Sequence, residues 1–174
     1  KGPPGLIIGL QWCYYIINRP FSQERRERGK TEMTDGKERI PYGELARKAI
    51  EAAGMSYSPY SKFRVGAALL SEDGRIFTGC NIENASYGAT VCAERTAFFK
   101  AVSEGVRRFS AIAITGGTEG VGLAAPCGVC RQVMAEFCGP EFKILLVTGK
   151  ERWETHTLGG LLPLAFGADM MEKK

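Results

Sequence analysis

Residues 111–147, AIAITGGTEGVGLAAPCGVCRQVMAEFCGPEFKILLV, contain the pattern that decides the fold. Two short apolar runs, Ala111–Ile114 and Lys143–Val147, are typical of buried strands. The stretch Gly128–Phe137 between them has helical character. A strand, a crossover helix and a second strand in this order predict a parallel pair of strands.

The segments before this unit extend the sheet and add helices. Apolar positions recur at helical spacing over residues 41–53, and Gly54 suits the end of that helix. Residues 64–70 and 75–80 flank the turn signal Ser-Glu-Asp-Gly, which predicts an antiparallel hairpin. A second helix is expected at about residues 92–104.

The last part of the chain completes the predicted architecture. Residues 153–157 can add an edge strand, and residues 158–166 a short final helix or turn. The prediction is an α/β protein with one mixed sheet of four or five strands. Helices on both faces of that sheet make it a three-layer α/β/α sandwich.

The first 32 residues differ in character from the rest. The chain starts with Lys1, and an apolar run over residues 6–17 is followed by a basic stretch. The run is too short to span a bilayer, and a signal peptide would carry its positive charge before the run. We expect residues 1–32 to be an extension that is unstructured or introduced by cloning, with peripheral membrane contact as the alternative. Residues 33–174 are the expected single domain.

Charge and cysteine usage narrow the function. The chain has 23 Lys and Arg against 19 Asp and Glu, but residues 33–174 hold 17 against 16. A nearly neutral domain argues against a nucleic-acid partner, which needs clustered positive charge, and favours a small uncharged substrate. Six cysteines with one Cys-x-x-Cys motif favour metal or redox chemistry in a reducing compartment. We therefore expect a cytoplasmic enzyme with no membrane partner.

Cys92, Cys127 and Cys130 are the candidate metal ligands. They fall where a strand or loop passes into a predicted helix, so backbone N–H groups and the helix dipole favour ionised sulfur. Three thiolates leave one corner of a tetrahedral zinc ion for water, which is the arrangement of a catalytic metal. Glu94 is then placed to move protons, although it could instead only cap the helix dipole. Arg95 can hydrogen-bond the sulfurs and offset their charge, and its alternative is a surface position.

A structural zinc would need a fourth protein ligand. Cys138 lies roughly 12 Å beyond Cys130 if the helix continues, which is too far for a shared metal. His156 is the only histidine and has no metal-like spacing to another ligand, so a surface position is expected. Cys80 is expected to be a buried strand residue, because free cysteine behaves as a small hydrophobe. The fourth position is left to solvent.

The motifs Cys-Ala-Glu at 92–94 and Pro-Cys-Gly-Val-Cys at 126–130 resemble those of zinc-dependent nucleoside and nucleobase deaminases. The similarity is strongest to the small, homotetrameric cytidine deaminases of pyrimidine salvage and covers most of residues 40–167. It is carried further by Ser58-Pro-Tyr-Ser-Lys-Phe63, Val65-Gly-Ala-Ala68, Gly79-Cys-Asn-Ile-Glu-Asn-Ala85 and Cys92-Ala-Glu-Arg-Thr-Ala97.

This resemblance implies hydrolytic deamination of cytidine and deoxycytidine to uridine, deoxyuridine and ammonia. It implies one zinc ion per subunit on the three cysteines, Glu94 as the proton shuttle, and a homotetramer with shared active sites. Substrate binding falls to Asn81 and Glu83 on the ribose hydroxyls, Phe63 on the base, Tyr60 and Tyr87 near substrate and subunit contacts, and Phe166 from a neighbouring subunit.

Three alternatives stay open. Asn81 and Glu83 could form only a polar turn, and Phe63 and Phe166 could be core residues. The substrate could be another cytosine compound, including cytosine in a polynucleotide. The third alternative is a zinc-stabilised binding module without catalysis, which would need a fourth protein ligand.

Overall fold

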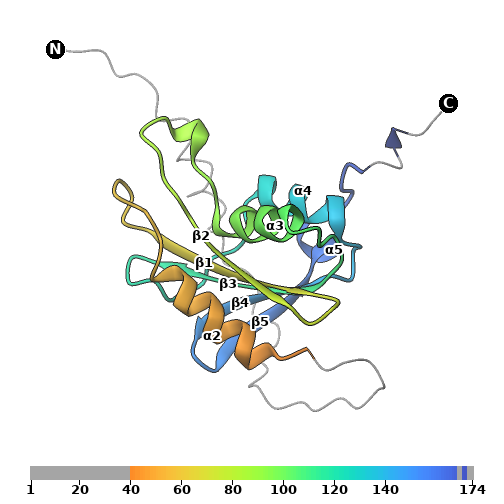
Figure 1. The fold of residues 1–174 in the computed structure, drawn as a ribbon, viewed down its shortest axis with the longest axis horizontal. Coiled ribbons are helices and arrows are strands. Elements are labelled where there is room, and N and C mark those ends of the chain that lie inside the picture. The colour runs from red at the N-terminus through yellow and green to blue at the C-terminus, as the bar shows by residue number, and fades with distance from the viewer. Residues whose placement is uncertain (1–39, 168–169, 172–174) are drawn as a thin grey trace.

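A five-stranded mixed sheet forms the centre of the computed structural model, which describes residues 40–167 and 170–171 (Figure 1). The strands are β1 (Arg64–Ser71), β2 (Ile76–Cys80), β3 (Phe109–Gly117), β4 (Lys143–Gly149) and β5 (Arg152–Thr157). Their order across the sheet is β2-β1-β3-β4-β5. The predicted pair β3 and β4 is parallel, and all other neighbours are antiparallel. The expectations for residues 1–32 lie outside the described residues.

Helices cover both faces of the sheet, as Figure 1 shows. Helix α2 (Tyr42–Ala53) lies on one face, and α3 (Ala93–Ser103) and α4 (Gly128–Phe137) lie on the other. The short helix α5 (Leu158–Leu161) follows β5, and a 3-10 turn, η1 (Tyr87–Ala89), precedes α3. The predicted three-layer α/β/α sandwich is confirmed.

Each face of the sheet has its own apolar core. On β1, Ala67 and Leu69 belong to the core under α3 and α4, whereas Ala68 and Leu70 belong to the core under α2. This alternation arises because successive side chains of a strand point to opposite faces of the sheet. Since helices cover both faces, successive residues in the middle of β1 are apolar.

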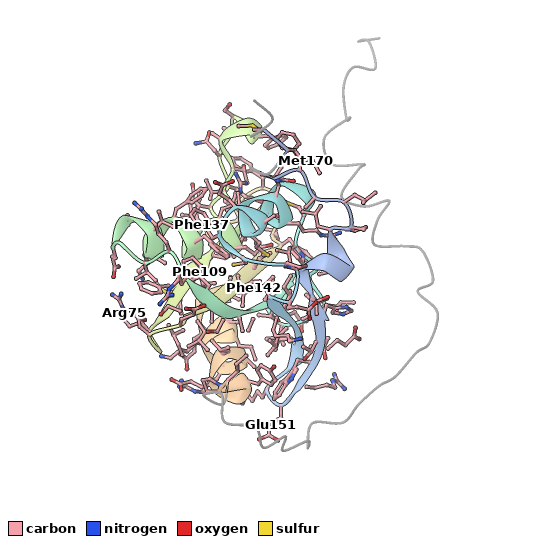
Figure 2. All side chains as sticks on the ribbon, turned by 90° about the vertical axis from the view of Figure 1, so that its right-hand side faces the viewer. Arg75, Phe109, Phe137, Phe142, Glu151 and Met170 are labelled. Carbon is pink, nitrogen blue, oxygen red and sulfur yellow. The ribbon has the colours of Figure 1, made fainter. Side chains whose placement is uncertain are left out.

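Aromatic side chains fill the larger core. Phe98 of α3 packs edge-on against Phe109, with ring centroids 4.9 Å apart. Phe109, Phe137 and Phe142 lie on this side of the sheet in Figure 2, and Phe98 is also 6.3 Å from Phe142. These contacts hold α3 and α4 against the sheet, so they fix the two helix starts that carry the candidate metal ligands.

Two glycines allow helices to lie directly on the sheet. A Cβ atom on Gly79 of β2 would lie 2.4 Å from the carbonyl oxygen of Ala93 and 2.5 Å from the amide nitrogen of Ala97. A Cβ atom on Gly66 of β1 would meet the backbone of α2 just as closely. The first turn of α3 is therefore set by backbone contact with β2.

One burial expectation is wrong. Cys80 is half-buried rather than buried, and its thiol donates a hydrogen bond to the carbonyl of Met55 at 3.3 Å. The reason is its position at the end of the edge strand β2, next to the end of α2, where few neighbours cover it.

Within residues 40–167 and 170–171, every helix is too short or too polar to cross a bilayer.

Candidate active site

Three cysteine sulfurs meet between the starts of α3 and α4. The Sγ atoms of Cys92 and Cys127 are 3.9 Å apart, those of Cys127 and Cys130 are 3.5 Å apart, and all three lie within 4.8 Å of one another. A tetrahedral zinc ion with bonds of ~2.3 Å separates its sulfurs by about 3.8 Å. The cluster therefore has the spacing of three corners of a zinc tetrahedron.

The helix starts explain why the sulfurs converge. Cys92 is the N-cap residue of α3 and Cys127 the N-cap residue of α4, and both have extended backbone angles. Neither sulfur caps its helix by a hydrogen bond, so its lone pairs stay available for a metal. Cys130 lies one turn into α4 and is fully buried.

The three sulfurs influence one another's ionisation. Hydrogen bonding with Cys130 and Cys92 lowers the pKa of Cys127, whereas the bond with Cys127 raises the pKa of Cys130. Without a cation, one sulfur therefore ionises at the expense of the others. A divalent ion removes this competition, because it attracts all three thiolates at once.

Glu94 lies beside the cluster in the first turn of α3. Its side chain is buried, with 4% of the residue exposed. Burial raises the pKa of its carboxyl to about 7, far above the usual value near 4.5. A carboxyl with a pKa near neutrality can both take and return a proton.

Arg95 bridges a sulfur and the preceding loop. Its guanidinium donates to the carbonyl oxygen of Thr90 at 3.0 Å and to Sγ of Cys92 at 3.6 Å. The guanidinium therefore lies against the metal-ligand cluster, in the position that hydrogen bonding to the sulfurs requires.

The other candidate metal ligands lie elsewhere. Among the described residues, the only group with metal-binding spacing consists of the three clustered cysteines. Cys138 packs against the larger core. His156 lies half-buried on β5, with Nε2 3.5 Å from a carboxylate oxygen of Glu154. In the part of the chain that the structure describes, no fourth side chain completes the cluster.

Asn81 is buried and makes three hydrogen bonds to the segment Ser56–Val65, which we call the substrate loop because the resemblance implies that Phe63 within it contacts the base. Its Oδ1 accepts from Ser56 Oγ at 2.6 Å and from the amide of Val65 at 2.8 Å. Its Nδ2 donates to the carbonyl of Phe63 at 2.8 Å. Only one amide hydrogen of Asn81 remains for another partner.

Glu83 contacts the tip of the same loop. Its carboxylate accepts from the amides of Tyr60 at 2.9 Å and Ser61 at 3.2 Å, and from the hydroxyl of Ser61. The structure thus brings Asn81, Glu83 and Phe63 together around one loop. Sequence reasoning missed Ser61, although it stands inside the motif Ser58-Pro-Tyr-Ser-Lys-Phe63.

The candidate aromatic residues are exposed. Phe63 lies within the substrate loop, and Tyr87 packs edge-on against Tyr60 with ring centroids 6.2 Å apart. Phe166 follows α5 and is 58% exposed, and its carbonyl accepts a hydrogen bond from the side chain of Gln132 on α4. Phe63 and Phe166 are therefore not core residues in this chain.

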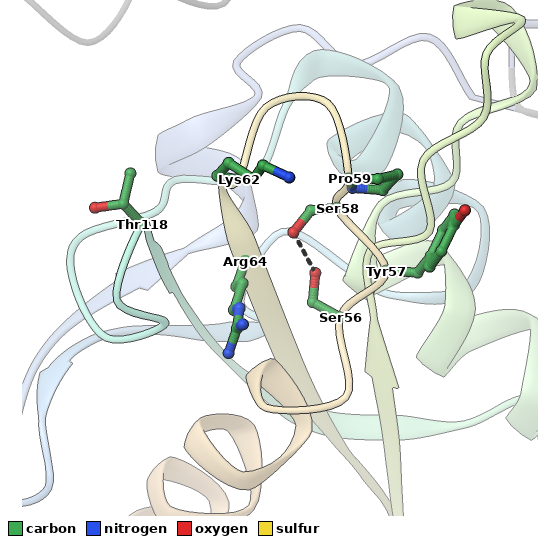
Figure 3. Close-up of a pocket in the computed structure, with 7 residues that line it drawn as sticks. All are labelled: Ser56, Tyr57, Ser58, Pro59, Lys62, Arg64 and Thr118. Carbon is green, nitrogen blue, oxygen red and sulfur yellow. Dashed lines mark hydrogen bonds between the residues drawn. The ribbon is translucent and has the colours of Figure 1, made fainter.

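A cavity of about 280 Å³ lies against the substrate loop (Figure 3). Its lining consists of Ser56, Tyr57, Ser58, Pro59, Lys62, Arg64 and Thr118. Arg64 lies two residues from Gly66, which faces α2, so the cavity belongs to the α2 side of the sheet. None of the clustered cysteines lines it, and it is separate from the candidate metal centre.

Comparisons with known proteins agree with this geometry. Residues 41–146 match the family model described as the cytidine and deoxycytidylate deaminase zinc-binding region. The cytidine deaminase of Sporosarcina psychrophila is 54% identical over 125 residues, which are 72% of this chain and 90% of that protein. The cytidine deaminase of Halalkalibacterium halodurans is 51% identical over 127 residues, or 73% of this chain and 95% of that protein.

Solved structures that are similar to this chain include cytidine deaminases. The cytidine deaminase of Burkholderia pseudomallei aligns with a TM-score of 0.68 at 46% identity, over 73% of this chain and 100% of that one. That of Mycobacterium tuberculosis aligns with a TM-score of 0.64 at 44% identity, over 74% and 99%. The zinc-binding region of the family model and the three-sulfur cluster fit one zinc ion per chain. The chain belongs to the cytidine deaminase family.

Proposed function

We propose that the protein catalyses the zinc-dependent hydrolysis of cytidine and deoxycytidine to uridine and deoxyuridine, with release of ammonia. One observation carries the proposal: three sulfurs at tetrahedral spacing, from the starts of α3 and α4, adjoin the buried Glu94 in the first turn of α3. Relatives that are more than 50% identical are cytidine deaminases, which supports the same substrate class.

The donor set fits zinc. Cys92, Cys127 and Cys130 would hold the ion, and sulfur donors in a tetrahedral arrangement favour zinc over magnesium or calcium. When bound, zinc supplies a Lewis acid that lowers the pKa of water. Arg95 offsets part of the negative charge of the three thiolates through its contact with Cys92.

Glu94 moves the protons of the reaction. Its carboxylate takes a proton from the attacking water and gives it to ring N3, which makes C4 of the pyrimidine more electrophilic. The water oxygen bonds to C4, and the carboxylate then takes the remaining proton of that oxygen and delivers it to the exocyclic amino group, so that the oxygen becomes the C4 carbonyl. The bond from C4 to that nitrogen breaks, and ammonia leaves. Burial raises the pKa of this carboxyl above its ordinary value, which favours a group that takes up and returns protons.

The sugar and base would bind at the substrate loop. Asn81 has one amide hydrogen left to donate to a sugar hydroxyl, and the Glu83 carboxylate can accept from one. Phe63 would stack on the base, with Tyr87 near the substrate. We assign the base end of the pocket to the metal centre and the sugar end to Asn81 and Glu83.

We also propose a homotetramer with shared active sites. Phe166 and Leu164 expose large apolar side chains after α5, and Val129 does so on α4. Such side chains suit burial against a second copy, and Phe166 would then enter the neighbouring pocket. Light scattering of purified protein should give four chains per particle, and a monomer that is fully active would contradict this part.

The proposed setting is pyrimidine salvage in the cytoplasm, without a nucleic-acid or membrane partner. The five cysteines of the described residues are free thiols, which suits a reducing compartment. Near-neutral charge over residues 33–174 supports a nucleoside rather than a polynucleotide as substrate.

The function can be tested with three substrates and a chelator. We expect the absorbance change of deamination with cytidine and deoxycytidine, and a much slower change with cytosine, which lacks the sugar. A chelator strong enough to strip a tri-thiolate zinc should abolish turnover, and added zinc should restore it. Zinc-loaded protein that turns over neither nucleoside would contradict the proposal and favour a binding module.

A further inference from the structure

We propose that Ser61 is a positioning residue that sets Glu83 and Phe63 in one geometry for the nucleoside. The inference rests on the proposed function, because it deepens how the same site binds the sugar and the base. Its basis is a pair of hydrogen bonds through one hydroxyl, which joins the side chain of Glu83 to the backbone of Phe63.

The Ser61 hydroxyl uses both of its hydrogen-bonding roles. It donates to Oε1 of Glu83 and accepts from the amide of Phe63 at 2.9 Å. The backbone amide of Ser61 donates to the other carboxylate oxygen, Oε2, at 3.2 Å. One residue therefore holds both oxygens of the sugar-binding carboxylate and also the backbone of the base-stacking aromatic residue.

Asn81 completes this arrangement from the other side of Phe63. Its side chain accepts from the amide of Val65 and donates to the carbonyl of Phe63, both at 2.8 Å. The peptide groups on both sides of Phe63 are thereby fixed, the amide through Ser61 and the carbonyl through Asn81. Removing either bond frees the aromatic side chain to rotate with its backbone.

The tip of the substrate loop has few other contacts: the Tyr60 ring packs edge-on against Tyr87, and the amide of Lys62 donates to the carbonyl of Ser58 at 3.1 Å. Tyr60, Ser61, Lys62 and Phe63 are all exposed, and of these four only Lys62 lines the 280 Å³ cavity (Figure 3). Lys62 also has φ of 59°, a left-handed conformation that residues other than glycine rarely adopt. With its side chains largely in solvent, this turn depends mainly on hydrogen bonds to stay in place.

The charge of Glu83 depends on the same bonds. Partial burial works to raise the pKa of its carboxyl, but the hydrogen bonds from Ser61 and from the amides of Tyr60 and Ser61 lower it overall. The carboxylate is therefore held ionised, as acceptance of a hydrogen bond from a sugar hydroxyl requires.

The test compares Ser61→Ala with Ser61→Thr on cytidine and on 3′-deoxycytidine. Loss of a hydrogen bond to a charged group should lower kcat/KM for cytidine about tenfold in Ser61→Ala, mainly through KM. The loss on 3′-deoxycytidine should not exceed about threefold, because the sugar contact of Glu83 is already missing there. Ser61→Thr keeps the hydroxyl and should restore activity to within about twofold of wild type.

Ser103→Ala is the matched control, because Ser103 is an exposed serine at the end of α3 opposite to Cys92, and its hydroxyl donates to the carbonyl of Lys100 at 2.7 Å. It should change kcat/KM by less than about twofold. Zinc content and thermal stability confirm that each variant is folded. If Ser61→Ala does not fold, Ser61→Val is used in its place. Valine has nearly the same volume as threonine but no hydroxyl, so Ser61→Val is then compared with Ser61→Thr.

Two outcomes would overturn the inference. The first is a loss below about twofold for cytidine in Ser61→Ala, and the second is an equal loss on both nucleosides, which a merely structural role would give. Failure of the proposed function would look different, since wild-type protein would then turn over neither substrate.

Discussion

Replacing Gly79 with alanine should displace the metal-binding helix. The new Cβ atom would lie 2.4 Å from the carbonyl oxygen of Ala93, whereas ordinary contact begins at 3.4 Å. Both atoms are held by backbone structure, so no flexible side chain can give way. Helix α3 must therefore retreat from β2 by about 1 Å, and it carries Cys92 and Glu94 with it.

A shift of this size has separate effects on folding and on the site. Overpacking of this kind costs about 1–3 kcal/mol of unfolding free energy. Zinc–sulfur distances tolerate only about 0.2 Å, so moving Cys92 away from Cys127 and Cys130 should weaken zinc binding as well. A misplacement of about 1 Å between catalytic groups lowers activity by on the order of 10²-fold.

Gly66→Ala provides the control for this experiment. Its Cβ atom would lie 2.1 Å from the carbonyl oxygen of Ala49 on α2, the opposite face of the sheet from the cysteines. Urea denaturation should show that both variants are destabilised. Metal analysis of the folded fractions should show zinc near one per chain in Gly66→Ala and clearly less in Gly79→Ala. Equal zinc occupancy and equal turnover in the two variants would refute the reasoning.

Three further changes test other parts of the structure. Arg95→Ala removes the contact with Cys92 and should weaken zinc affinity by about 10- to 100-fold in a chelator competition, while Arg95→Lys should recover part of it. Thr115→Val leaves a buried carbonyl of β4 without its partner and should cost about 1–3 kcal/mol in urea denaturation. Hydrogen bonds from Arg75 and the neighbouring serine lower the pKa of Asp73, so the stability it contributes is present above about pH 3.8 and is lost as pH falls through the lowered value. The difference in melting temperature between wild type and Asp73→Asn should therefore shrink as pH falls below about 3.8. A difference that stays constant over that pH range would contradict this prediction.

Local sequence patterns predicted the layers of the fold because each element carries its own signal. The helix Gly128–Phe137 has the predicted bounds, since an N-cap residue precedes it and Gly139 and Pro140 follow it. Strand β3 is longer than its apolar run, because Phe109 and Gly117 also pair with β1. Such pairing depends on residues far away in the sequence.

In the site, too, local patterns predicted some residues, whereas others depend on contacts far away in the sequence. The cysteines were identifiable because metal ligands have a characteristic spacing, whereas Ser61 is one hydroxyl in a polar loop without any period. Cys80 was expected to be buried because its residue type suggests it, but burial at the end of an edge strand depends on tertiary neighbours. The roles of Asn81, Glu83 and Phe166 stay predictions that variants can test.

The most direct test of the central claim is a paired measurement of zinc content and cytidine turnover in Glu94→Gln. The amide matches the carboxyl in shape but cannot carry the proton, so zinc should remain near one per chain while kcat falls by about 10²- to 10⁴-fold. Turnover close to that of the wild type would contradict the account, because the buried carboxyl beside the three sulfurs would then have no part in the reaction.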